Sequence, residues 1–94
     1  MTTTVDTLAG ARAYVAAYAE PVEAAHTHED ALAALGQLER AARKAYDRLA
    51  VDLVLTHGWS YAQLGRAAGM TRQAALKRFG PAVDDQLRRN IRGR

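Results

Sequence analysis

Basic and amide side chains gather within one short stretch of the chain, from Arg66 to Arg78. Arg72 and Gln73 are adjacent there, and Lys77 and Arg78 follow about one helical turn later. An arginine can donate two hydrogen bonds to guanine O6 and N7, and a glutamine can pair with adenine N6 and N7. Lysine and arginine also bind phosphate oxygens. These residue types suit contact with a polyanion whose base edges are accessible.

Charge is distributed unevenly along the 94 residues. Residues 1–65 carry five basic and eight acidic side chains, whereas residues 66–94 carry eight basic and two acidic ones. The net charge of +3 therefore divides into −3 and +6. A basic C-terminal third favours a polyanion-binding end attached to another region, and the alternative is an ordinary solvated surface.

A second group of candidate ligands, His26, His28 and Glu29, lies in the sequence HTHED. Three ligands within four residues at the start of a helix do not point to one centre, and no fourth ligand follows at a recognised spacing. The chain has no cysteine, which excludes a disulfide or a thiolate metal site. The sequence also lacks a Gly-rich phosphate loop and a nucleophile beside a base. We therefore expect no metal, no cofactor and no enzymatic activity.

Composition favours helix over most of the chain, because 21 of the 94 residues are alanine and β-branched residues are few. We expect a first helix that ends at Pro21. A second helix, about thirty residues long, should begin after a capping Thr27 and end at Gly58.

The long helix carries an apolar stripe with spacings of three and four residues. Its members are Leu35, Leu38, Ala42, Ala45, Tyr46, Leu49 and Leu53. A chain of this length buries only about six to seven tenths of its unfolded surface, so its core is thin. The stripe can pack within the chain or against a second copy, and we expect both. A homodimer is therefore predicted.

Residues 59–81, WSYAQLGRAAGMTRQAALKRFGP, predict two short helices that meet at a tight corner. Ser60 and Gln63 have the spacing of a capping box at the start of the first helix. Gly69 tolerates the positive φ of a sharp turn, Met70 can turn inward, and Thr71 can cap the second helix.

We expect the second helix of this corner to run from Arg72 to Phe79 and to close at Gly80-Pro81. Its predicted inward positions are Ala75, Leu76 and Phe79. A separate short helix should follow, with an apolar stripe formed by Val83, Leu87 and Ile91. The fourteen residues after Gly80 are too few and too poor in β-formers for a wing.

The corner resembles the helix-turn-helix of bacterial DNA-binding regulators. That pattern has a small residue, three residues, a glycine, an apolar residue and a capping Ser or Thr, as in GRAAGMT from Gly65 to Thr71. The resemblance covers residues 60–80, roughly a fifth of the chain, and the stretch is similar to small regulators of high-GC actinobacteria. Gly65 stands where alanine is usual, and the inner face of the second helix is mostly alanine.

The resemblance implies that residues 71–79 enter the major groove and that the first turn of this helix reads bases. Arg72 and Gln73 stand at those positions. The start of the helix at Thr71 and the basic residues Arg66, Lys77 and Arg78 are expected to meet phosphate.

We therefore expect an all-α fold: a small helical domain with a long central helix and a C-terminal helix-turn-helix without a wing. Residues 1–58 should form a helical dimerisation or support region. Residues 59–94 should form the DNA-binding region with its short C-terminal helix, within one compact domain.

The expected function is that of a dimeric, sequence-specific DNA-binding protein and transcriptional regulator. Its expected partners are double-stranded DNA and a second copy of the chain, in the cytoplasm at the nucleoid and without membrane contact. Two alternatives stay open. One is a helix-turn-helix-shaped module that binds RNA polymerase or another protein, and the other is a nucleoid-associated DNA-binding protein of low specificity.

Overall fold

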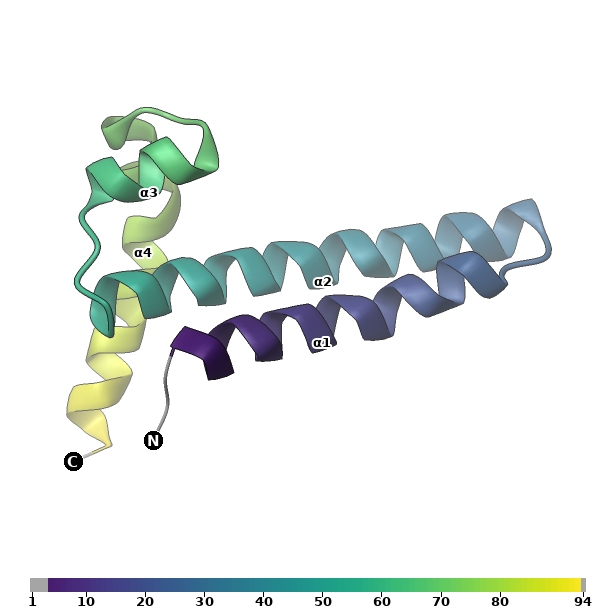
Figure 1. Cartoon of the computed structure of the whole chain (residues 1–94), viewed down its shortest axis with the longest axis horizontal. Coiled ribbons are helices and arrows are strands. Elements are labelled where there is room, and N and C mark those ends of the chain that lie inside the picture. Colours follow the sequence, from purple (N-terminus) through teal and green to yellow (C-terminus); the bar gives the residue numbers. More distant parts are fainter. Residues whose placement is uncertain (1–3, 94) are drawn as a thin grey trace. The chain divides into compact units, whose positions relative to one another are not determined.

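The computed structural model describes residues 4–93 and contains four helices there (Figure 1). They are α1 (Thr4–Ala24), α2 (His28–Leu55), α3 (Tyr61–Ala68) and α4 (Arg72–Arg92). Residues 4–93 contain no strand, so the predicted all-α class and the long central helix are confirmed. Of the helices in this range, none combines the length and the apolar character that a membrane crossing needs.

The chain divides into two compact units, Met1–Leu49 and Ala50–Arg94, which we call the N-terminal unit and the C-terminal unit. The boundary falls inside α2, which contributes its first part to one unit and its last turns to the other.

Helix α2 begins where the sequence predicts. The backbone N–H of Asp30 donates to Oγ1 of Thr27 at 3.0 Å, which satisfies one of the N–H groups left open at a helix start. Glu29 and Asp30 lie in the first turn, where the helix dipole favours negative charge. The helix is 28 residues long and ends at Leu55. Gly58, predicted to end it, comes three residues later, just after the turn at residues 56–57, with a φ of 71°.

Two predicted helix ends are wrong, because both prolines lie inside helices. α1 continues past Pro21 to Ala24, and α4 runs through Pro81 to Arg92 as one helix of 21 residues. The predicted short C-terminal helix is therefore the second half of α4.

Packing explains why α4 continues through Pro81. A proline removes one helical N–H, and its ring crowds the residue before it. Gly80 precedes the ring and has no Cβ to meet it. Phe79 and Val83, one turn apart on either side of Pro81, are only 1% and 4% exposed. Continuous burial of this face outweighs the hydrogen bond that is lost.

In the N-terminal unit, α1 and α2 run antiparallel (Figure 1). The predicted stripe of α2 is divided between two sides of that helix. Leu38 and Ala45 are half-buried beside Ala41, which is 4% exposed and lies outside the predicted stripe. Leu35 and Tyr46 are exposed by 49% and 40%. An apolar surface this wide exceeds what one neighbouring helix covers.

The core of the C-terminal unit is formed by the last turns of α2 together with α3 and α4. Its buried members are Ala50, Leu64, Ala75 and Phe79. Half-buried apolar side chains pack against them, namely Leu53, Val54, Trp59, Tyr61 and Met70. Phe79 is the largest side chain that is fully buried among the residues described. This small core sets the angle between α3 and α4.

Candidate nucleic-acid interface

The first helix of the corner, α3, begins with the predicted capping box. Ser60 N–H donates to Oε1 of Gln63 at 2.8 Å, and Gln63 N–H donates to Oγ of Ser60 at 3.1 Å. These reciprocal bonds satisfy two N–H groups that the helix itself leaves open. The N-terminus of this eight-residue helix is therefore capped by side chains of its own first turn and of the residue before it.

The turn after α3 depends on two glycines with different roles. Gly69 has a φ of 75°, in the left-handed region that glycine adopts without strain. The N–H groups of Gly69 and Met70 both donate to the carbonyl of Gly65, the latter at 2.8 Å. Gly65 is buried against the backbone of the turn, and a Cβ built on it would lie 2.6 Å from the carbonyl oxygen of Met70. An alanine side chain therefore does not fit at this position without movement of the turn.

The second helix, α4, begins at the predicted cap. Thr71 is extended, with φ −74° and ψ 164°, and its Oγ1 accepts a hydrogen bond from the N–H of Ala74 at 3.0 Å. Met70 is half-buried and packs against the core, as predicted. These contacts hold the first turn of α4 in a fixed relation to α3.

One predicted inward position of α4 is wrong. Ala75 and Phe79 are buried as expected, but Leu76 is 39% exposed. Ala75, Phe79 and Val83 follow one another at intervals of four residues and use the whole inward face. Leu76 lies one position further around the helix, so its side chain extends beside the core rather than into it.

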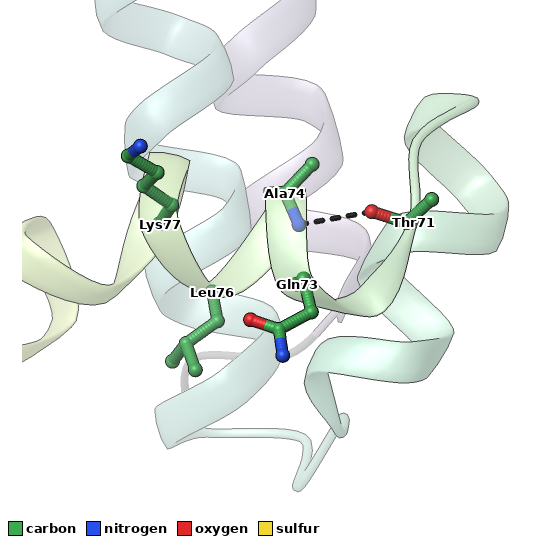
Figure 2. A pocket seen from close by; sticks show the side chains of 5 residues that line it. All are labelled: Thr71, Gln73, Ala74, Leu76 and Lys77. Carbon is green, nitrogen blue, oxygen red and sulfur yellow. Dashed lines mark hydrogen bonds between the residues drawn. The ribbon is translucent and has the colours of Figure 1, made fainter.

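The predicted contact residues lie on α3 and on the first turns of α4, all within the C-terminal unit. Five of the six are exposed: Arg66, Thr71, Arg72, Gln73 and Lys77. A shallow hollow at the start of α4 is bordered by five residues, Thr71, Gln73, Ala74, Leu76 and Lys77 (Figure 2). In Figure 2 the side chains of Gln73 and Leu76 extend from the same side of α4.

Arg78 differs from the other predicted contact residues. It is half-buried, and its guanidinium carbon lies 5.1 Å from the centre of the Phe79 ring. A cation at this distance from an aromatic ring is attracted by the ring's quadrupole. Arg78 therefore covers the edge of the core in addition to carrying positive charge.

Acidic side chains offset part of the positive charge in the second half of α4. Asp85 Oδ2 accepts a hydrogen bond from Nη2 of Arg89 at 2.5 Å, and Asp85 Oδ1 lies 4.0 Å from Nη2 of Arg88. Exposed pairs of this kind contribute little to stability, but they lower the local net charge. The first turns of α4 carry only basic charge, because both acidic residues of the basic third lie at positions 84 and 85.

Tyr61, at the start of α3, is half-buried against the core. Burial raises the pKa of its phenol, and the Asp84 carboxylate of α4 raises it further. Both effects disfavour the phenolate, because an anion is poorly solvated there and is repelled by a second anion. The phenol is therefore neutral at neutral pH.

Comparisons with protein-family models, with curated proteins and with solved structures found no match for this chain.

Proposed function

We propose that this chain is a dimeric, sequence-specific DNA-binding protein that acts as a transcriptional regulator by inserting the start of α4 into the major groove. The observation that supports it most is the exposed pair Arg72 and Gln73 in the first turn of a helix fixed by a capped, glycine-dependent corner. An α-helix fits the major groove, and these two side chains suit guanine and adenine edges.

The remaining basic residues suit the phosphates on either side of the groove. Lys77 is exposed one turn after Gln73, and Arg66 is exposed in the last turn of α3. Phosphate contacts supply affinity and orientation, and base contacts supply specificity. We assign Arg72 and Gln73 to base edges, and Arg66, Lys77, Arg78 and the N-terminal end of α4 at Thr71 to phosphate.

A second copy of the chain is the proposed partner of the exposed apolar side of α2. Leu32 and Leu35 are 75% and 49% exposed and lie on the same side as Ala42 and Tyr46. Ala41 is the only buried apolar side chain among residues 8–49, so the N-terminal unit has almost no core of its own. Covering Leu32 and Leu35 in a dimer supplies the missing burial, and a dimer carries two copies of α4, as a two-fold DNA site requires.

The test is enrichment of binding sequences from a random double-stranded DNA library, followed by gel-shift titration at two salt concentrations with competitor DNA. The proposal predicts an enriched inverted repeat whose binding survives competitor. Its half-sites should be separated by about one helical turn, roughly 34 Å, or by a multiple of it.

Gln73 supplies the matched variant for this enrichment. Gln73→Ala should relax the preference at one A·T position, at a cost of about 1–3 kcal/mol on the enriched site and almost none on random DNA. Binding that is salt-dependent but equal for all sequences would support a nucleoid-associated protein of low specificity instead. Complete failure to bind DNA would favour a protein-interaction module.

A further inference from the structure

The exposure of Leu76 is unexpected for a leucine near the start of a helix whose inner face is buried. It is 39% exposed, although Ala75 before it and Phe79 after it are 0% and 1% exposed. Leu76 therefore contributes little to the core of the C-terminal unit. It offers an apolar surface among polar residues, bordering the same hollow as Gln73 and Lys77.

The position of Leu76 beside Gln73 indicates what that surface could contact. The two side chains extend from the same side of α4 (Figure 2), and residues three apart on a helix are neighbours about 5–6 Å apart at Cβ. Along the helix axis they are separated by about 4.5 Å, from a rise of 1.5 Å per residue. Successive bases of one DNA strand are about 3.4 Å apart. Leu76 would therefore reach the base pair next to the one that Gln73 contacts.

Only one apolar group is available on base edges in the major groove, the 5-methyl group of thymine. Contact with this methyl group suits an exposed leucine, which has no hydrogen-bonding atom in its side chain. We propose that Leu76 is a specificity-determining residue that recognises a thymine methyl group in the base pair adjacent to the one read by Gln73. This inference rests on the proposed function and adds a second kind of base contact to it.

Replacement of thymine by deoxyuridine tests the contact, because it removes the methyl group and leaves base pairing unchanged. In the enriched site, each thymine is replaced singly and the dissociation constant of the unmodified protein is measured. One position per half-site, next to the A·T pair affected by Gln73→Ala, should bind about fourfold more weakly. This factor corresponds to about 0.8 kcal/mol for one buried methyl group, at 1.4 kcal/mol per tenfold change.

The variant Leu76→Ala should lose this sensitivity and bind the thymine and deoxyuridine sites with equal affinity. Leu87→Ala is the matched control, because Leu87 is a leucine of the same helix with a similar exposure of 43% and lies outside the first turns. It should keep the fourfold difference. Circular dichroism establishes that both variants keep the helical content of the parent.

The possible outcomes separate the two proposals. If a site is enriched and Gln73→Ala relaxes its specificity, but no deoxyuridine position weakens binding, the role of Leu76 is wrong and the proposed function stands. The same holds if Leu76→Ala keeps the full sensitivity to the methyl group. If no sequence is enriched, the proposed function fails and the role of Leu76 fails with it.

Discussion

Replacing Gly65 by alanine tests how the corner between α3 and α4 is built. A Cβ at this position would lie 2.6 Å from the carbonyl oxygen of Met70 and 3.0 Å from both the carbonyl carbon and the oxygen of Thr71. The Met70 oxygen would have to move by about 0.8 Å to reach an ordinary contact distance of 3.4 Å. All three atoms belong to the backbone, so no side chain can rotate away to relieve the contact.

Movement of this turn disrupts hydrogen bonds on both of its sides. Met70 N–H donates to the Gly65 carbonyl at 2.8 Å, and the carbonyl of Thr71 accepts from Ala75 N–H at 2.9 Å. Crowding in a packed site costs about 1–3 kcal/mol. Alanine in place of a helical glycine contributes about 1 kcal/mol in the opposite direction. Together these terms give a net loss of about 0–2 kcal/mol in the free energy of unfolding, and we expect the upper half of this range because the clash is with backbone.

Gly36 provides the matched control, since it also lies inside a helix. The atoms nearest to a Cβ there are the guanidinium nitrogens of Arg40, at 3.7 and 3.9 Å, which are ordinary contact distances. Gly36→Ala should therefore stabilise the protein by roughly 0.5–1 kcal/mol through helix propensity alone. The same substitution is predicted to have opposite signs at the two positions.

Urea unfolding followed by circular dichroism measures both variants, and fluorescence of the single tryptophan, Trp59, reports on the core of the C-terminal unit. Gly65→Ala should lower the urea midpoint in both signals. It should also weaken binding to the enriched DNA site, because a displaced turn moves Arg72. A raised midpoint for Gly65→Ala, equal to that of Gly36→Ala, would refute the close approach of the turn to α3.

Three further tests address the proposed interface, the dimer and the electrostatics of α3. Arg72→Ala should weaken binding to the enriched site by about 1–3 kcal/mol and leave binding to random DNA almost unaffected. Lys77→Ala should weaken binding to both DNAs and lower the magnitude of the salt slope by about one. Equal losses for Arg72→Ala on both DNAs would contradict its assignment to base edges. Leu35→Asp should weaken the dimer at least about tenfold in analytical ultracentrifugation, because an unpaired charge is costly to bury, while Gln37→Asp, at another exposed position of α2, should not. A stable monomer for the unmodified chain at micromolar concentration would remove the dimer. Burial raises the pKa of Tyr61 in the folded protein, so folding favours the neutral phenol. The stability that this preference contributes is fully present below the unfolded pKa of about 10 and is lost as the pH rises through the folded pKa. Tyr61→Phe should make the fall in melting temperature above pH 10 less steep, and an unchanged pH dependence would contradict the burial of the phenol.

The sequence alone determined the features that depend on residues a few positions apart. The caps at Thr27, Ser60 and Thr71 each join a side chain to a backbone N–H three residues later. The turn at Gly69 needs a residue that tolerates positive φ. These bonds form within one turn of helix, so local residue types were sufficient to predict them. Helical content followed from composition in the same way, because alanine has the highest helix propensity of the common residues.

The exposed positions of Arg72 and Gln73 were also predictable, because they follow directly from the cap at Thr71 and from the burial of Ala75 and Phe79. Once the start and the inner face of a helix are known, the 3.6-residue period fixes the direction of every other side chain. The error at Leu76 arose because an apolar residue beside the inner face was expected to share it. Residue type alone does not distinguish a core leucine from an exposed one.

Side-chain burial and close approaches of the backbone depended on tertiary packing. Pro81 lies inside α4 because Phe79 and Val83 are buried on one continuous face, which local propensity does not anticipate. Gly65 is required because the carbonyl of Met70 returns to within 2.6 Å of where its Cβ would be. The apolar stripe of α2 is divided between a buried side and an exposed side that includes Leu35, because neighbouring helices cover only part of its width. Burial depends on which atoms occupy the surrounding space, and the order of residues in one helix does not contain that information.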